Sequence, residues 1–446
     1  MMTITPSPTH RSGRMKYVLP VLLGVSLGAS VMPAGQTNAV RTLTLADAQK
    51  VALQYHPQIA RANYLALAAQ ETVVETRAGF FPDVNVYGTA AGVNSEGARI
   101  MAGGLNNPSI FDRAAGGVQV NQLITDFGRT ANLTASSRFQ AQAASQNANT
   151  TREQVLLQVD TAYFGALGAQ AVLRVAQQTF DTRQLLRDQV AALATNKLRS
   201  ELDVSFAQVQ LEQARLLLEK SQNDADAAMA TLSTALGYRE YRRFQLVEQP
   251  PPTNALINVV SDLIQAALIQ RPELLALRAE RDASLRFAKA ERDARLPTLA
   301  AVGVAGDAPT HDSHLPDNYA AAGVQVSLPL FEGGLYVARQ HEAELKAQAD
   351  AEVLRNLEND VIRDVRIAWL NVNNALEQLH TSEDLVRNAA EAFDLAQARY
   401  QTGISSIVEL SEAQLNLTSA QIANASARYN VLIQEANLNY QIGALP

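Results

Sequence analysis

Apolar residues recur at alternating steps of four and three along two long segments of the chain. In the first segment these seam positions are Val155, Val159, Ala162, Ala166, Ala169, Leu173, Ala176 and Phe180. Adding 206 to each number gives the seam of the second segment: Val361, Val365, Ala368, Val372, Ala375, Leu379, Ser382 and Val386. This spacing is typical of a coiled coil, and the many alanines indicate close helix approach. The pattern predicts two similar long helices, over 130–196 and 336–401.

Two other segments alternate apolar and polar residues with a period of two. The alternation is found in Val84-Asn85-Val86 and again in Val324-Gln325-Val326. This period is typical of a strand with one apolar and one polar face. We therefore predict strand hairpins over 83–126 and 298–331. The pattern fits a membrane barrel strand and a half-exposed strand of a soluble sheet equally well.

The chain contains the same plan twice. Gly117-Val118-Gln119-Val120 recurs as Gly323-Val324-Gln325-Val326, an offset of 206. His56-Pro57 matches Arg271-Pro272 at an offset of 215, and the difference, 215 − 206 = 9, falls within the strand hairpins. Loops accept such insertions easily. The sequence thus predicts a first repeat over 40–237, an equatorial linker over 238–261, and a second repeat over 262–446.

Each repeat is predicted to place a strand hairpin between helices. The first contains helices over 45–78, the hairpin 83–126, the long helix 130–196 and a returning helix over 203–236. The second contains a helix over 262–294, the hairpin 298–331, the long helix 336–401 and a returning helix over 407–442. Both long-helix segments lack proline, and at 1.5 Å per residue each helix would be about 100 Å long.

The first residues, 1–39, are expected to be a cleaved signal peptide. Basic residues precede an apolar run from Tyr17 to Met32, and small residues follow. A retained membrane anchor is the weaker alternative, because Pro20 and several glycines interrupt the run. Beyond residue 40 no run of 18 apolar residues is present, so a membrane crossing would have to use strands. Two hairpins per chain cannot close a barrel, and closure would need several copies.

Composition excludes several other classes of function. The formal net charge is −7, and no basic patch is present that would bind nucleic acid. The chain has no cysteine, no phosphate-binding loop and no metalloprotease motif, and Gly303 with Gly306 lacks the third glycine of a dinucleotide fingerprint. His311 and His314 lie near aspartates, but a solvated loop is expected there and no metal site. We expect neither an enzyme nor a bound cofactor.

The junctions and turns between these elements resemble those of the TolC-like outer-membrane efflux factors. The segments that carry the resemblance are Leu123 to Gly128, Leu328 to Gly334, Ser200 to Gln208, and Tyr400 to Gln414. The resemblance covers the whole chain after the signal peptide. It implies an α+β membrane protein in which long helices form an α-barrel in the periplasm. A transmembrane β-barrel, with four strands from each chain, would be completed by trimerisation in the outer membrane.

The resemblance also implies a function and partners. The homotrimer would be a passive exit duct of a tripartite efflux or type I secretion system. It would meet outer-membrane lipid, a periplasmic adaptor protein and an inner-membrane pump. The alternative is a periplasmic structural coiled-coil protein of the cell envelope, which explains the seam but not the strand pairs. A secreted enzyme with a helical accessory domain is a further alternative, but the duplication leaves no room for a catalytic core.

Site residues follow from the resemblance position by position. Glu409 and Glu412 would narrow the periplasmic aperture, although acids at a helix N-terminus are also favoured by the helix dipole alone. The resemblance further implies gate contacts by Asp203 and Tyr400, and adaptor-tip contacts by Leu198, Arg199, Gly403 and Ile404. The sequence departs from the family at Ser405, where its best-known members carry an arginine, and at Lys197, where the second repeat has Gly403. The contacts that close the mouth are therefore expected to differ.

Overall fold

The computed structural model describes residues 41–92, 101–102, 105–106, 113–248, 259–310 and 316–445. The predicted signal peptide, residues 1–39, lies outside this part of the chain and stays a prediction. Most of the described residues are helical, and most of the others belong to strands. No helix in the described part of the chain combines the length and the apolar character that a membrane crossing requires.

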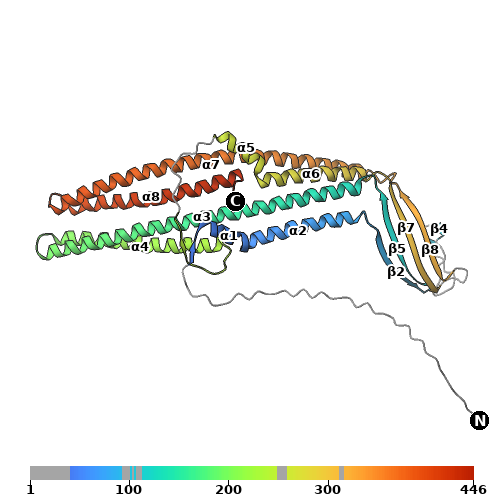
Figure 1. Ribbon diagram of the computed structural model, residues 1–446, viewed down its shortest axis with the longest axis horizontal. Coiled ribbons are helices and arrows are strands. Elements are labelled where there is room, and N and C mark those ends of the chain that lie inside the picture. The colour runs from blue at the N-terminus through green and yellow to red at the C-terminus, as the bar shows by residue number, and fades with distance from the viewer. Residues whose placement is uncertain are drawn as a thin grey trace, which may run out of the picture. The chain divides into compact units, whose positions relative to one another are not determined.

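The helices follow the same order in both repeats (Figure 1). In the first they are α1 (Leu45–Tyr55), α2 (Pro57–Ala78), α3 (Arg129–Thr195) and α4 (Glu201–Ala235). In the second they are α5 (Val260–Gln270), α6 (Pro272–Asp293), α7 (Leu335–Gln401) and α8 (Ile407–Ile442). The helices α3 and α7 have 67 residues each, which corresponds to a length of about 100 Å.

The segment 262–294 is two helices and not the one helix that we predicted. Arg271 separates α5 from α6, and Pro272 begins α6. Proline suits the first position of a helix, but it also disfavours a helical conformation in the residue before it. Arg271 accordingly has an extended ψ of 124°. In the first repeat, His56 before Pro57 has a ψ of 123° and makes the same break.

A glycine at the end of each returning helix packs against the helix break of its own repeat. Gly237 and Gly443 have φ values of 85° and 71°, the left-handed region that glycine adopts without strain. A Cβ atom on Gly237 would lie 3.1 Å from Cα of His56, and one on Gly443 would lie 3.4 Å from Cα of Arg271. Glycine is thus favoured at both positions by conformation, and at Gly237 also by close approach.

Four long strands form one antiparallel sheet in the order β2-β5-β7-β8. Their bounds are Asp83–Ala91 for β2, Arg113–Thr125 for β5, Thr298–Thr310 for β7 and Asn318–Ser327 for β8. The two hairpins meet where β5 pairs with β7, and a side chain on Gly306 would collide there with the ring of Tyr319. Between β2 and β5 the short strands β3 (Met101–Ala102) and β4 (Leu105–Asn106) pair with each other. The sheet of the described residues is open, with β2 and β8 as its edges.

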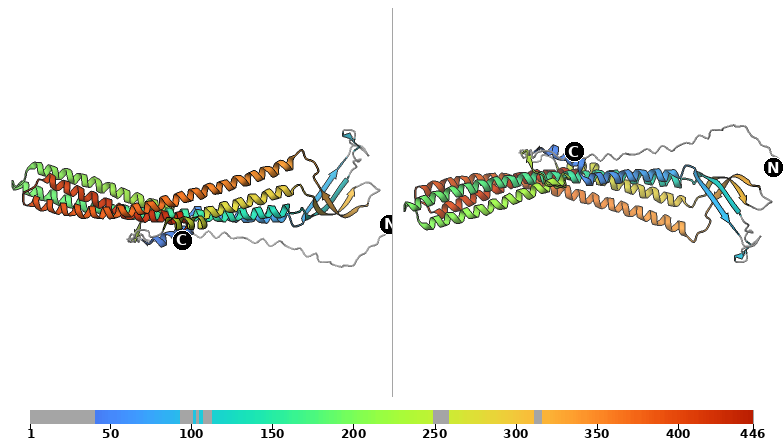
Figure 2. Two further views of the ribbon diagram at one scale, coloured as in Figure 1. Left: turned by 90° about the horizontal axis from the view of Figure 1, so that it is seen from above. Right: turned by 90° about the horizontal axis from the view of Figure 1, so that it is seen from below.

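The long helices run side by side, and the sheet lies at one end of them (Figures 1 and 2). In the half nearer the sheet, α3 packs between α2 and α6, and α6 packs against α7. In the other half, α3 packs between α4 and α8, and α8 packs against α7. The seam residues of α3 and α7 are buried or partly buried, and Val155, Val159, Val361 and Val365 are fully enclosed.

A small parallel sheet marks the middle of the helical region. Its strands are β1 (Arg41–Leu43) and β6 (Phe244–Leu246). The hydroxyl oxygen of Tyr163 in α3 lies 2.9 Å from the carbonyl oxygen of Leu43 and accepts a 3.1 Å hydrogen bond from the Val247 amide. The predicted linker 238–261 is therefore not wholly irregular, because it contains β6 and the start of α5. Residues 249–258 lie outside the described part.

A buried carboxyl group lies where α1 packs on α3. Asp160 is 4% exposed, and its Oδ1 accepts a 2.7 Å hydrogen bond from Nε2 of Gln49. Burial raises the pKa of Asp160 to about 6, although the Gln49 hydrogen bond favours the charged form. The folded protein thus binds this proton more tightly than the unfolded chain. Stability from this group is lost as the pH rises from about 4 to about 6.

We expect Asp160→Asn to raise the thermal unfolding midpoint at pH 8 and to raise it less at pH 5. Asparagine keeps an acceptor for Gln49 and never ionises, so a cost of about 3 kcal/mol above pH 6 disappears. Asp224→Asn, at an exposed position on α4, is the matched control and should shift neither midpoint. A lower midpoint for Asp160→Asn at pH 8 would contradict the argument.

Candidate functional site at the helical turns

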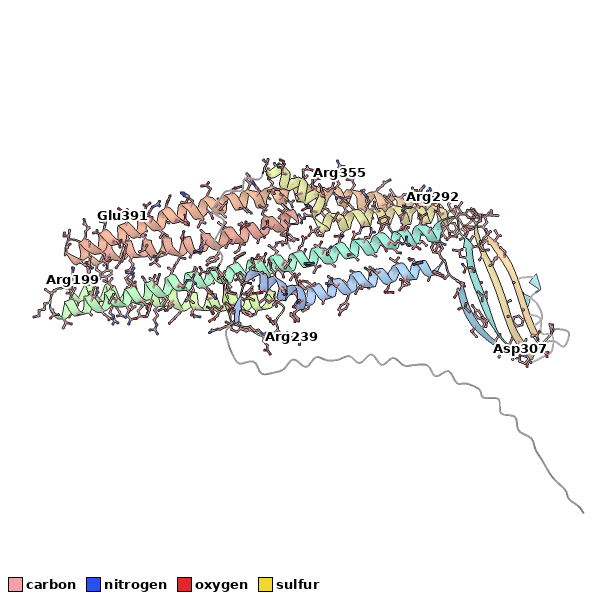
Figure 3. The ribbon with its side chains drawn as sticks, in the orientation of Figure 1. Arg199, Arg239, Arg292, Asp307, Arg355 and Glu391 are labelled. Carbon is pink, nitrogen blue, oxygen red and sulfur yellow. The ribbon has the colours of Figure 1, made fainter. Side chains whose placement is uncertain are left out.

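Two turns of equivalent sequence position lie at the end of the helical region remote from the sheet. Figure 3 shows Arg199 at this end and Asp307 at the far end of the sheet. Lys197 and Gly403, which differ by the repeat offset of 206, both have positive φ values, 58° and 78°. In each turn one backbone amide donates a 2.9 Å hydrogen bond to a carbonyl in the last turn of the preceding helix. The Leu198 amide donates to the Leu193 carbonyl, and the Ile404 amide donates to the Arg399 carbonyl. The two turns therefore share one backbone conformation.

A serine caps the helix that follows each turn. The hydroxyl of Ser200 accepts from the Asp203 amide at 3.1 Å, and the Asp203 carboxylate accepts from the Ser200 amide at 3.3 Å. This reciprocal pair is a capping box. The hydroxyl of Ser406 accepts from the Glu409 amide at 3.4 Å. Asp203 and Glu409 thus lie in the first turns of α4 and α8, where the helix dipole favours an acid.

The two predicted aperture acids are both exposed on α8. Their spacing of three residues puts Glu409 and Glu412 on one face of the helix. Nε of Arg399, in the last turn of α7, lies 3.1 Å from Oε1 of Glu409. Both side chains of this pair are about half exposed, so solvent weakens it. Glu409 consequently has a neighbouring positive charge on the paired helix α7.

Tyr400 is enclosed near the turns and contacts Arg199 rather than Asp203. Its side chain belongs to an apolar cluster with Val190 and Leu410, and the residue is 5% exposed. Burial raises the pKa of the Tyr400 hydroxyl, while the Arg199 charge lowers it. This hydroxyl has no hydrogen-bond partner among the described residues. Tyr400 and Asp203 do not bond to each other there, and their role as gate contacts stays a prediction.

The predicted adaptor-tip residues differ in their exposure. Leu198 is 69% exposed and Ile404 is 70% exposed. Gly403, in the turn between α7 and α8, is exposed as well. Arg199 is only partly exposed, because its guanidinium lies over the Tyr400 ring. Three of these four residues are therefore exposed, and their role as adaptor contacts stays a prediction.

The helix interface next to the turns contains polar groups that the sequence analysis did not identify. Arg183 of α3 is 4% exposed, and its Nη2 donates to the carbonyl of Ser411 on α8 at 3.1 Å. Burial lowers the pKa of Arg183 to about 10. One step further from the turns, the hydroxyls of Thr179 and Thr418 lie 3.3 Å apart. No local pattern distinguishes these residues from surface residues of a helix.

A pocket of about 230 Å³ lies beside these contacts. Its lining includes Leu186, Val190, Phe393, Tyr400, Leu410 and Gln414. The described residues contain no group of three or more His, Asp or Glu side chains that could hold a metal ion. His311 and His314 lie outside the described part of the chain.

Comparison with known proteins gives a consistent result. The model of the outer membrane efflux protein family matches residues 49–238 and 263–444. The outer membrane protein TolC of Escherichia coli K12 is 25% identical over 452 residues, which covers 97% of this chain and 87% of TolC. The probable efflux pump outer membrane protein TtgC of Pseudomonas putida is 25% identical over 405 residues, 86% of this chain and 79% of TtgC.

Solved structures share the fold. The CmeC outer membrane channel of Campylobacter jejuni has a TM-score of 0.74 at 16% identity, covering 98% of this chain and 94% of CmeC. The MtrE outer membrane channel of Neisseria gonorrhoeae has a TM-score of 0.73 at 18% identity, covering 92% of this chain and 93% of MtrE. The family model matches most of the chain, one segment in each repeat. The chain therefore belongs to the outer membrane efflux protein family.

Proposed function

We propose that three copies of this chain form the exit duct of a tripartite efflux or type I secretion system. The duct lies in the outer membrane of a Gram-negative bacterium and extends into the periplasm. It is a passive conduit and performs no catalysis. The observation that carries this proposal is that one copy leaves both its sheet and its helices with open, partly apolar edges.

The edges of the sheet support closure by further copies. Strands β2 and β8 are the edge strands, and their apolar residues Val86 and Val324 are exposed. In lipid, unpaired backbone groups cost several kcal/mol each, so an open edge cannot remain there. Three copies of the four-stranded sheet give a barrel of twelve strands, 3 × 4. Pairing of β2 in one copy with β8 in the next would remove every edge.

The helices support the same closure. Leu202, Val209 and Leu216 of α4 are exposed and recur every seven residues, with Phe206 between them. This is the spacing of a coiled-coil seam without its partner helix. At the other edge, α7 exposes Leu370, Leu385 and Leu395. Packing of α4 against α7 of the next copy would bury both sets and close the helices into a tube.

The two turns form the periplasmic mouth of this tube. Three copies of Glu409 and Glu412 would make two stacked rings of negative charge, and such rings favour cations in a pore. Tyr400 and Asp203 act as gate contacts beside this aperture. Leu198, Gly403 and Ile404 are free to meet a periplasmic adaptor protein, which links the duct to an inner-membrane pump.

The proposal is tested by the mass and the conductance of the detergent-purified protein. Light scattering is expected to give the mass of a trimer, and planar bilayers are expected to show a small, cation-selective single-channel conductance. A monomer or dimer without conductance would contradict the proposal. That result would favour the alternative, a structural coiled-coil protein of the envelope.

A further inference from the structure

The pocket beside the turns is lined by three helices of one chain. Leu186 and Val190 of α3 and Phe393 of α7 belong to its lining. The helix α8 packs against both α3 and α7 and contributes Leu410 and Gln414. The volume of the pocket is about 230 Å³, whereas an apolar cavity of about 150 Å³ is enough for a benzene molecule. The pocket therefore has room for a molecule of one or two aromatic rings.

Two polar atoms of the lining have no hydrogen-bond partner among the described residues. They are the hydroxyl oxygen of Tyr400 and Oε1 of Gln414. Tyr400 is 5% exposed and Gln414 is 4% exposed, so both side chains are largely closed off from solvent. Buried polar atoms in folded proteins are nearly always paired, because the hydrogen bonds that they lose to water have to be replaced. A molecule in the pocket would supply the missing partners.

The charged groups nearest to Tyr400 are engaged elsewhere. Cζ of Arg199 lies 4.3 Å from the centroid of the Tyr400 ring, and its Nη2 donates a 2.8 Å hydrogen bond to the Tyr400 carbonyl. The Asp203 carboxylate accepts the Ser200 amide in the capping box. Burial raises the pKa of the Tyr400 hydroxyl, so this group keeps its proton at physiological pH. It is therefore free to donate a hydrogen bond to a ligand.

The two unpaired atoms define the polar group of the ligand. The Tyr400 hydroxyl can donate, whereas Oε1 of Gln414 can only accept. A carboxylate would place its lone pairs against those of Oε1. An ammonium group would be repelled by Arg199, the one charged residue that lines the pocket in the described part of the chain. A hydroxyl group suits both atoms, because it accepts one hydrogen bond and donates another.

We propose that this pocket is a binding site for a small phenol, a molecule of one or two aromatic rings with a single hydroxyl group. The rings lie against the apolar side chains of the three helices. The ligand hydroxyl accepts a hydrogen bond from Tyr400 and donates one to Oε1 of Gln414. All the lining residues belong to one chain. The site therefore does not depend on assembly into a duct, and it goes beyond the proposed function.

Binding of 2-naphthol to the detergent-purified protein tests the site. Isothermal titration calorimetry, with the same detergent without protein as the blank, is expected to show saturable binding of one molecule per chain. Naphthalene lacks the hydroxyl group, and 2-naphthoate carries a carboxylate in its place. Each should bind about tenfold more weakly or worse, because the polar atoms of the pocket then stay unpaired. Absence of 2-naphthol binding, or equal binding of naphthalene, would overturn the proposal.

Two variants test the polar contacts separately. Tyr400→Phe and Gln414→Leu each remove one unpaired polar atom at similar volume, so the thermal unfolding midpoint should not fall. Each is expected to weaken 2-naphthol binding about tenfold and to leave naphthalene binding unchanged. Gln213→Leu, at an exposed position on α4, is the matched control and should bind 2-naphthol like the wild type. Unchanged affinity for 2-naphthol in both pocket variants would overturn the proposal.

A third variant tests where the ligand lies. Leu186 is partly exposed on α3 and lines the pocket, so the larger side chain of Leu186→Trp should occupy the space of the ligand. We expect this variant to keep its unfolding midpoint within a few degrees and to lose binding of both 2-naphthol and naphthalene. Leu216→Trp, at an exposed position on α4, is the control and should keep both. Retained 2-naphthol binding in Leu186→Trp would overturn the proposal, whereas the mass and conductance of the assembly test the duct separately.

Discussion

Replacing Glu409 and Glu412 together by glutamine is expected to remove most of the cation selectivity of the duct. Both residues are exposed on the face of α8 that follows the turn. Rings of like charge at a constriction concentrate ions of the opposite sign, and glutamine keeps the side-chain shape without the charge. The ratio of K⁺ to Cl⁻ permeability, from reversal potentials in planar bilayers, should fall toward one. Block by Mg²⁺ should weaken by about tenfold or more, which is about 1.4 kcal/mol.

The single variants should not be equal. Arg399 lies 3.1 Å from Glu409 and offsets part of its charge, whereas no ion pair is described for Glu412. We therefore expect Glu412→Gln to lower the selectivity more than Glu409→Gln. Glu201→Gln, in the first turn of α4, removes an acid from the other turn and should change selectivity little. Unchanged selectivity and Mg²⁺ block in the double variant would show that these carboxylates do not line the aperture.

The sequence predicted those parts of the fold that depend on local periodicity. The seam residues Val155 and Val361 step with the helix, and Val84 and Val324 alternate with the strand, so each pattern is visible within a few turns or residues. The break at Arg271 was missed, although Pro272 lies in the interior of the predicted helix 262–294 and disfavours a helical conformation in the residue before it. Contact between hairpins has no comparable local pattern.

The candidate site was less predictable for this reason. Arg199 and Tyr400 are 201 residues apart, and their contact depends on how α3 and α7 pack. The sequence contained one indication that the two turns differ. At the repeat offset of 206, Arg199 of the first turn corresponds to Ser405 of the second, so the arginine is not repeated. Arg183 gave none, because a single arginine among polar residues is typical of an exposed helix face. The site residues carried over by resemblance lie at the turns, where Arg399 pairs with Glu409 and Arg199 contacts Tyr400.

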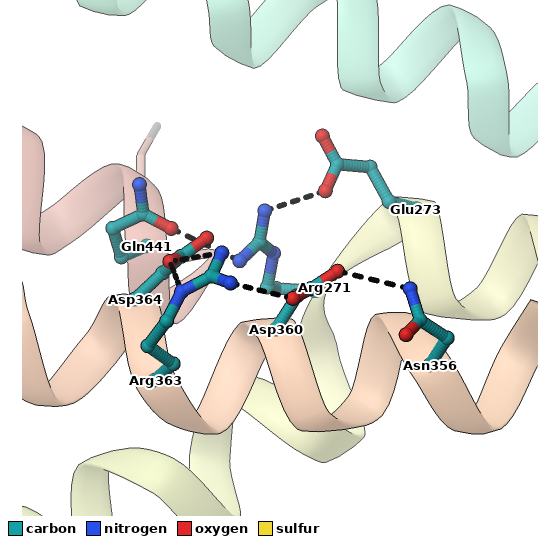
Figure 4. Close-up of polar contacts among 7 residues, drawn as sticks. All are labelled: Arg271, Glu273, Asn356, Asp360, Arg363, Asp364 and Gln441. Carbon is teal, nitrogen blue, oxygen red and sulfur yellow. Dashed lines mark hydrogen bonds and ion pairs between the residues drawn. The ribbon is translucent and has the colours of Figure 1, made fainter.

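Arg271→Leu is expected to destabilise the folded chain strongly. Figure 4 shows the Arg271 guanidinium between Glu273 and Gln441, and its side chain is 7% exposed. Nη2 lies 2.5 Å from Oε2 of Glu273, Nη1 donates to Oε1 of Gln441 at 3.0 Å, and the Tyr440 hydroxyl donates to the other Glu273 oxygen at 3.1 Å. Loss of one partner from a buried pair costs about 3–5 kcal/mol, because the other charge stays buried.

Glu153 increases this cost. Burial and the nearby charge of Glu273 raise the pKa of Glu153 to about 7, and Arg271 opposes this rise. Without Arg271, two carboxyl groups would face each other with less compensation. We expect the thermal unfolding midpoint to fall by on the order of 10 °C at pH 8. The fall should be smaller at pH 5, which lies below the raised pKa of Glu153.

A second variant and a control distinguish lost charge compensation from lost packing. In Arg271→Leu with Glu273→Gln, the unpaired charge is also removed, so part of the stability should return. Arg363→Leu is the control from the same view in Figure 4, where Arg363 pairs with Asp360 and Asp364. Its side chain is 60% exposed, and exposed pairs contribute at most about 1 kcal/mol. Arg271→Leu could instead lower the thermal unfolding midpoint no more than Arg363→Leu does. That result would show that the buried pair of Arg271 and Glu273 does not hold α8 against the break between α5 and α6.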